Sequence, residues 1–208
     1  MIFSLNDCVN FQLYAKFPYM GQHSRLWSKL FVVVLIFAAV FMFFRFNRPQ
    51  VVLVMDKSFS IAYPASALED FKKDLGREGY NLKQVVADSE TFMDSVKLET
   101  LLSEYSDCAL MLTSPVISTA VRAGQIELSS LIKGLAVGMT TDCEDSFDIV
   151  LSADPDSMPE GTYYLDTIGK TDVAGLIYPD LGMSIIPLLK MDKTNLTVRE
   201  AVTVYEVR

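Results

Sequence analysis

Histidine and cysteine are scarce in this chain. His23 is the single histidine, and Cys8, Cys108 and Cys143 are the three cysteines of the 208 residues. The scarcity argues against a histidine-based catalytic triad and against histidine-ligated metals, and it leaves no CxxC spacing for zinc. Cys108 and Cys143 fit either a disulfide in an oxidising compartment or two buried free thiols.

Basic charge and nucleotide-binding motifs are also missing. The chain carries 18 Lys and Arg against 26 Asp and Glu, a net charge of -8. The basic residues are scattered, which argues against nucleic acid as a partner. No GxGxxG, GxxxxGK[ST] or GxSxG motif occurs, so the usual phosphate cradles and the nucleophile elbow are absent. We therefore expect no enzyme activity, no cofactor and no metal.

A long apolar run is the first positive feature. Residues 27–46 read WSKLFVVVLIFAAVFMFFRF, without interruption from Leu30 to Phe44. At about 1.5 Å per helical residue, such a run crosses a hydrocarbon core of about 30 Å. No small-x-small cleavage site follows it, so we expect an uncleaved transmembrane signal anchor over 27–48. A cleaved signal peptide and a buried core helix are the alternatives.

The charges around this run predict its orientation. One more basic residue lies before or at the start of the run than after it, which favours a cytoplasmic N-terminus and an extracytoplasmic, periplasmic domain. Residues 1–26 are then an unstructured cytoplasmic segment. Because a normal basic signal start begins at Met20, both Met1 and Met20 stay open as the first residue. We expect a single-pass membrane protein.

Downstream of the run, short apolar β-rich stretches alternate with helical patterns. The expected strands are VVLVM (51–55), NLKQVVAD (81–88), CALMLTS (108–114), LAVGMTT (135–141) and FDIVLSAD (147–154). The expected helices cover 64–80, 91–105 and, as one or two shorter pieces, 118–134. Nearly continuous apolar strands that alternate with helices predict a parallel sheet with helices on both faces.

The pattern weakens beyond Pro155. A sixth strand is expected within 172–180, and a short apolar helix interrupted at Pro187 within 181–191. The stretch 197–207 fits either a strand or a helix. We expect one α/β lobe over 49–154, followed by a C-terminal extension over 155–208 that is open as the start of a second lobe.

Hydroxyl and carboxylate residues recur where the expected strands end. Ligands of an open parallel sheet bind outside the carboxyl ends of the strands, near the point where the strand order reverses. The same residue types are also ordinary turn and N-cap residues, so the ligand interpretation depends on their recurrence at one edge. The residues that follow the five expected strands are 56–59, 88–89, 113–115, 140–142 and 152–154.

Several of these stretches resemble a known family. Residues 51–90 are similar to the opening of type I periplasmic binding proteins and of the related sugar-responsive repressor core. They read VVLVMDKSFSIAYPASALEDFKKDLGREGYNLKQVVADSE. The third, fourth and fifth strands of that family are resembled by YSDCALMLTSPVISTAV, GLAVGMTTD and FDIVLSAD, respectively. The short motif DKSF is similar to one in the nucleoside-binding lipoproteins of the same superfamily. The resemblance covers roughly 51–154 and implies a flavodoxin-like lobe. It implies polar ligand contacts from Asp56, Ser58, Ser114, Thr140 and Asp154, and stacking by Phe59.

The chain departs from the family in two ways. Family members close two lobes on the ligand, whereas the residues after the apolar run suffice for one lobe and the start of a second. A lipoprotein anchor would need a cysteine just after the signal region, and none occurs there.

The expected function is that of a membrane-anchored, extracytoplasmic solute-binding or sensing protein for a sugar, nucleoside or amino acid. The alternative is a truncated or degenerate lobe that acts as a protein-interaction module at the membrane. A transporter permease and a second copy of the chain are open as partners. A hydrolase or transferase is disfavoured because no nucleophile–base pair is visible.

Overall fold

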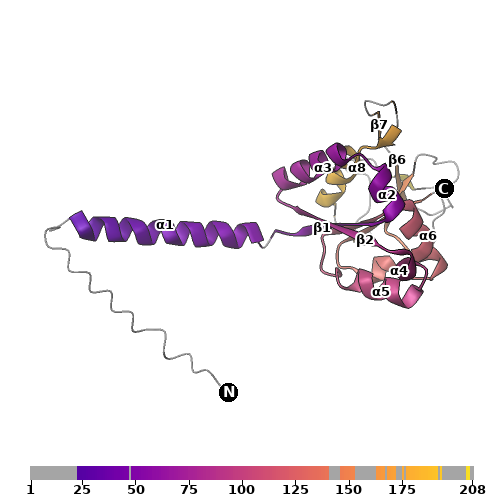
Figure 1. Cartoon of the computed structure of the whole chain (residues 1–208), viewed down its shortest axis with the longest axis horizontal. Helices are drawn as coiled ribbons and strands as arrows, with labels where there is room; N and C mark the ends of the chain where they lie inside the picture. The colour runs from indigo at the N-terminus through magenta and orange to yellow at the C-terminus, as the bar shows by residue number, and fades with distance from the viewer. Residues whose placement is uncertain are drawn as a thin grey trace, which may run out of the picture. The chain divides into compact units, whose positions relative to one another are not determined.

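A computed structural model gives the fold of the chain (Figure 1). It describes residues 23–46, 48–140, 146–152, 163–166, 168–171, 175, 177–191, 193 and 205–206. The chain divides into two compact units, Met1–Asn47 and Arg48–Arg208.

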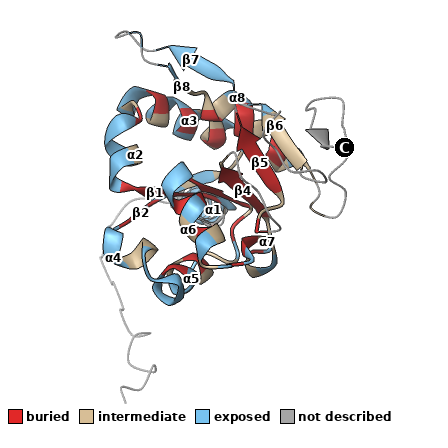
Figure 2. Cartoon of the chain, turned by 90° about the vertical axis from the view of Figure 1, so that its right-hand side faces the viewer, coloured by how far each residue is buried: buried red, intermediate tan, exposed pale blue. Residues whose placement is uncertain are grey.

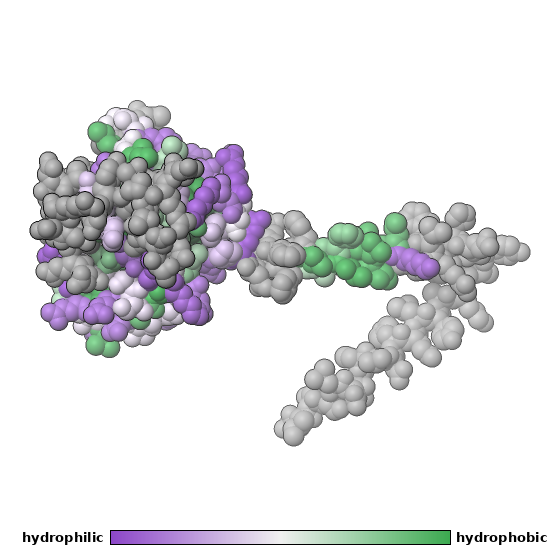
Figure 3. Space-filling model, turned by 180° about the vertical axis from the view of Figure 1, so that it is seen from behind, coloured by the Kyte–Doolittle hydropathy of each residue, from purple (hydrophilic) through white to green (hydrophobic). Residues whose placement is uncertain are grey.

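The first unit contains the helix α1 (His23–Phe46). Its apolar sequence holds neither glycine nor proline, so no residue breaks the helix. The described apolar side chains from Leu30 to Val40 are exposed and form a continuous hydrophobic band (Figure 3). Within the described part of the chain, no helix combines the length and the apolarity that crossing a membrane requires. The signal anchor over 27–48 stays a prediction.

The second unit is built on a sheet with the strand order β2-β1-β3-β4-β5-β6-β9. Strands β1 to β6 are parallel, and β9 runs antiparallel to β6. The order 2-1-3-4-5 is that of flavodoxin-like sheets, which confirms the predicted parallel α/β fold. The strands are β1 (Gln50–Asp56), β2 (Asn81–Ala87), β3 (Leu110–Thr113), β4 (Leu135–Met139), β5 (Ile149–Ser152), β6 (Tyr163–Asp166) and β9 (Tyr205–Glu206).

Strand β1 shows why the sheet is covered on both faces. Its side chains alternate, so Leu53 and Met55 join one hydrophobic cluster while Val52 and Val54 join the other. All of them are buried. A strand buried on both faces reads as an unbroken apolar run, and VVLVM is such a run.

Helices cover each face of the sheet (Figure 2). The first face carries α3 (Ala65–Arg77), α8 (Leu181–Ile185) and the 3-10 helix η2 (Ile186–Lys190). The second face carries α5 (Ser95–Ser103), α6 (Pro115–Ala123) and α7 (Leu128–Leu131). In α3 the apolar side chains recur at helical spacing, so Ala67, Phe71 and Leu75 are buried while most of the charged side chains are exposed.

Two segments differ locally from the sequence-based expectation. The residues after β1 form the short helix α2 (Lys57–Ala62), because Asp56 accepts hydrogen bonds from the first backbone N–H groups. The helix expected over 91–105 is divided into α4 (Ser89–Phe92) and α5. The Asp94 side chain caps α5, which begins a new helix there, and Val96 in its first turn is 70% exposed.

A strand forms within 172–180 as expected, but it is not the sixth strand of the parallel sheet. The sixth parallel strand is β6, which comes before 172–180. Within 172–180 lies β8 (Ile177–Pro179), which pairs with β7 (Gly169–Thr171) in a separate two-stranded sheet. The apolar helix of 181–191 is interrupted near Pro187, as predicted, where α8 passes into η2.

The expected domain boundary at Asp154 falls among residues outside the described part of the chain. The elements beyond it, β6, α8 and η2, lie in the same sheet and core as those before it. Cys108 is a free, buried thiol, and Cys143 lies outside the described residues.

Candidate functional site

Two of the predicted site residues meet at the carboxyl edge of the sheet. Strand β1 lies between β2 and β3, so the strand order reverses at β1, and ligands of open α/β sheets bind beside such a reversal. Asp56 ends β1 and Ser114 follows β3. The Ser114 hydroxyl donates a hydrogen bond of 2.9 Å to Oδ1 of Asp56. Residues 58 positions apart in the sequence are thereby joined at the reversal point.

Asp56 also caps helix α2 with its second oxygen. Oδ2 accepts hydrogen bonds from the backbone N–H groups of Ser58 (2.9 Å) and Phe59 (3.2 Å). The residue is 4% exposed and Ser114 is fully buried. Burial raises the pKa of Asp56, but the hydrogen bonds from Ser114 and the backbone outweigh burial and leave the pKa below its usual value. The carboxylate is charged, and both of its oxygens are engaged within the protein.

A row of aromatic rings runs from α2 to β8. Phe59 stacks on Tyr63 with ring centroids 5.4 Å apart, and Tyr63 meets Tyr178 edge to face at 5.6 Å. The Tyr63 hydroxyl donates to the Pro179 carbonyl at 2.8 Å. Burial raises the pKa of Tyr63 far above its ordinary value. Phe59 is the half-buried outer ring of this row.

The hydroxyls after β3 bond within the protein. Oγ of Ser118 lies 2.7 Å from Oγ1 of Thr113, and the Ser118 hydroxyl is also within hydrogen-bond distance of the Thr113 carbonyl. Both residues are buried. These contacts tie the end of β3 to the first turns of α6. Among the described residues, every buried side-chain nitrogen or oxygen atom has a hydrogen-bond partner.

The remaining predicted site residues lie as follows. Ser58 is exposed in the first turn of α2, and Thr140 directly follows β4 and is half-buried. Because β1, β3 and β4 are parallel neighbours, Thr140 shares the edge of Asp56 and Ser114. Asp154 lies outside the described residues. The sequence predicted only that Asp56 and Ser114 lie at the same edge of the sheet. The structure adds the direct hydrogen bond between them.

Three cavities among the described residues lie away from the predicted site residues, and one of them, of about 380 Å³, is lined by Lys193 and Gly134. A groove of about 580 Å³ lies beside α4 and α6, and a pocket of about 300 Å³ lies between α3 and the β7–β8 hairpin. Tyr63 and Tyr178, which sequence reasoning missed, line the pocket between α3 and the hairpin. The groove is lined by Phe92, Met93, Ser95, Val116, Thr119, Ala120, Ala123 and Gly124.

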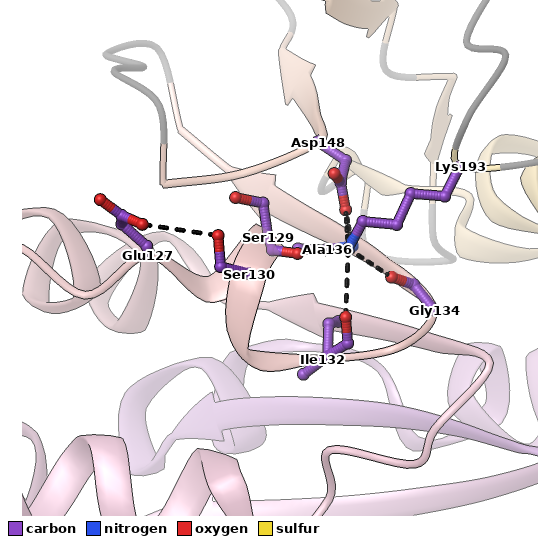
Figure 4. A network of polar contacts seen from close by, with 8 residues as sticks. All are labelled: Glu127, Ser129, Ser130, Ile132, Gly134, Ala136, Asp148 and Lys193. Atoms are coloured by element: carbon purple, nitrogen blue, oxygen red, sulfur yellow. Dashed lines mark hydrogen bonds and ion pairs between the residues drawn. The ribbon is translucent and has the colours of Figure 1, made fainter.

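A second polar cluster lies where β4 and β5 begin (Figure 4). Nζ of Lys193 lies 3.2 Å from Oδ2 of Asp148. It also donates to one backbone carbonyl of α7 and to two carbonyls of the turn between α7 and β4. Sequence reasoning missed this cluster because backbone carbonyls carry no sequence signal. Within the described ranges, no three His, Cys, Asp or Glu side chains are grouped to hold a metal ion.

No protein-family model, curated protein or solved structure matches the chain. The resemblance to type I periplasmic binding proteins stays a prediction from short motifs. The geometry at the reversal point is therefore the main support for a functional assignment.

Proposed function

We propose that this protein is a membrane-anchored, non-catalytic binding or sensing domain for a small polar ligand such as a sugar, nucleoside or amino acid. One observation carries the proposal. Asp56 and Ser114, from the two strands beside the reversal of strand order, are in contact where open α/β sheets hold ligands.

The burial of these residues divides the predicted site into two roles. Asp56 and Ser114 use their polar atoms on each other and on α2, so we assign them to positioning the loops. Ser58 and Phe59 are more exposed, and we assign the direct contacts to them. A hydroxyl beside an aromatic ring suits a sugar or a base, which stacks on the ring face and hydrogen-bonds at its rim. Thr140 and Asp154 complete the proposed contact set.

The membrane anchor is the second part of the proposal. Its support is the apolar run from Leu30 to Phe44 and the exposed apolar side chains of α1, because a large exposed apolar surface calls for lipid or protein to cover it. The charge bias around the run favours an extracytoplasmic lobe. A lobe of the type I periplasmic binding kind would then work beside a transporter permease or a second copy of the chain.

Calorimetric titration tests the ligand proposal. The full chain, held in mild detergent, is titrated with panels of sugars, nucleosides and amino acids. For any compound that binds, F59A and S58A should each weaken binding by about two- to tenfold, the scale of one lost stacking or hydrogen-bonding contact. S66A removes an exposed hydroxyl from α3 and serves as the matched control. Flat heats across every panel would count against a small-molecule ligand.

The second candidate is a protein-interaction module at the membrane. The groove beside α4 and α6 favours it, because Met93 is 83% exposed and Val116 is also exposed, and exposed apolar patches often mark protein contacts. A photo-crosslinking amino acid at position 93 should then capture a partner in native membranes. The same crosslinking group at Lys72, an exposed residue of α3, should capture none. Equal capture at both positions, together with a ligand found by calorimetry, would reject this candidate.

A further inference from the structure

The ammonium group of Lys193 is surrounded by oxygen atoms (Figure 4). Nζ donates to the carbonyls of Ile132 and Gly134 at 3.1 Å each, and to the carbonyl of Ser129. Oδ2 of Asp148 lies 3.2 Å from the same nitrogen. Three neutral dipoles and one negative charge thus converge on a single positive charge.

The four oxygens are held in place by contacts that do not involve Lys193. The Ser129 N–H donates to the Ser146 carbonyl at 3.0 Å, and the Ile132 N–H donates to the Leu128 carbonyl at 3.2 Å. The Leu135 N–H, which follows the Gly134 carbonyl, donates to the Ala109 carbonyl at 3.1 Å. Oδ2 of Asp148 also accepts from the Ala136 N–H at 2.8 Å, and the Asp148 N–H donates to the Ala136 carbonyl at 2.9 Å. Strand β4 therefore fixes the carboxylate, and the turn before β4 fixes the carbonyls.

The donor set suits a monovalent cation. An ammonium group has three protons to donate. Four oxygens surround Nζ of Lys193, so there is one more acceptor than there are donors. Rings of carbonyl oxygens replace the hydration shell of K⁺ in channels, so oxygens of this kind can hold a bare cation or an ammonium. The carboxylate of Asp148 is only 10% exposed and the Lys193 side chain 29%, so the pair is largely shielded from water. Removing the cation would leave a nearly buried carboxylate that keeps the Ala136 N–H but loses its counter-ion.

We propose that these four oxygens form a binding site for a primary ammonium group, and that the chain fills the site with its own Lys193. The site takes primary amines, ammonium and K⁺, which share one positive charge and a similar radius. Lys193 acts as a tethered ligand that attaches the chain beyond η2 to the edge of the sheet where β4 and β5 begin. If Lys193 and Asp148 formed only a structural ion pair, the oxygens would not bind a free cation after Lys193 is removed.

Chemical rescue of the full chain tests the proposal. The variant K193A should lower Tm by roughly 5–15 °C, because the Asp148 carboxylate loses its partner. Ammonium chloride or methylammonium chloride should restore most of that loss with a saturating dose dependence. Tetramethylammonium chloride at equal ionic strength carries the same charge on a much larger ion that cannot approach the four oxygens, and it should restore none. Wild-type Tm should respond to the three salts alike.

Two further variants separate the site from its surroundings. K190A removes a neighbouring exposed lysine that pairs with Glu78 and should show no specific ammonium response. The double variant D148N/K193A should lose the rescue. If K193A does not fold, K193M keeps most of the aliphatic stem and should fold only when ammonium is present. A variant that no salt rescues, or that all salts rescue equally, would overturn the proposal.

Discussion

Asp56 receives hydrogen bonds from the Ser114 hydroxyl and from the backbone N–H groups of Ser58 and Phe59. Burial raises the pKa of this carboxyl, and the hydrogen bonds lower it further than burial raises it. A pKa that is lower in the folded than in the unfolded chain stabilises the fold above the unfolded value, and this contribution is lost as pH falls through the folded value. Its loss therefore begins at about pH 4 and continues below it.

Removing the Ser114 hydroxyl should weaken this stabilisation. For S114A we expect a higher pKa of Asp56, an acid-unfolding midpoint at higher pH, and a loss of about 1–2 kcal/mol in the free energy of unfolding at neutral pH. Circular dichroism during acid and urea titrations measures both. S58A is the control, because Asp56 is bonded by the Ser58 backbone and not by its side chain. Identical midpoints for S114A and S58A would contradict the role given to the hydroxyl.

Two glycines should respond oppositely to replacement by alanine. A Cβ on Gly134 would collide with the backbone of Cys108 and Ala109, whereas one on Gly76 would meet nothing within 4 Å. G134A should lower the free energy of unfolding by about 1–3 kcal/mol or more through overpacking. G76A, in the last turns of α3, should raise it by roughly 0.5–1 kcal/mol. Urea unfolding measures both, and a neutral G134A would show that the backbone there can move.

The thiol of Cys108 should be unreactive in the native protein. Burial raises its pKa to about 11, and the residue is only 4% exposed. In a C8S/C143S background, iodoacetamide at pH 8 should label Cys108 many times more slowly in buffer than in urea, because little thiolate is present and access is blocked. Rapid labelling in buffer would mean that the start of β3 opens readily.

At the scale of elements, the restart of α5 at Asp94 makes a testable contrast within one helix. Val96 is 70% exposed and Leu98 is fully buried. V96K should change the free energy of unfolding by no more than about 0.5 kcal/mol, whereas L98A should lower it by about 2–5 kcal/mol. Chemical unfolding compares the two. A costly V96K would mean that the helix continues unbroken through Asp94 in solution.

The elements that could be predicted are those in which burial alone dictates the pattern of apolar side chains. Strand β1 was predictable because burial on both faces requires an unbroken apolar run such as VVLVM. The division at Asp94 was missed because an N-cap bond competes locally with helical periodicity. The strand within 172–180 was predictable, but its pairing with β7 in a separate sheet was not, because pairing is set by the neighbouring strand.

The site was predictable to a similar degree. The recurrence of Asp56 and Ser114 at strand ends indicated a common edge, but their hydrogen bond depends on the lateral order of β1 and β3. The oxygens around Lys193 were not predictable, because three of the four belong to the backbone. Any residue type can supply a carbonyl, so only the folded path of the chain brings these groups together.

At the scale of the whole molecule, the last helices complete the core. Leu181, Ile185 and Leu188 are buried in the cluster that also holds β1 and α3. Three such side chains contribute roughly 5–9 kcal/mol of burial, comparable to the total stability of a typical domain. A chain that ends at Asp154 should therefore aggregate or remain unfolded, as size-exclusion chromatography and circular dichroism would show. The milder I185A should fold with a loss of about 2–5 kcal/mol.

The position of β1 at the start of the lobe affects how the protein is made. Its strand is the first of the lobe to leave the ribosome, yet α8, which covers one of its faces, comes near the end of the chain. At about 5–20 residues per second, the strand waits on the order of ten seconds for that cover. During this interval its apolar side chains are open to other nascent chains. Slower translation of the C-terminal codons should lengthen the exposure and increase the demand for chaperones.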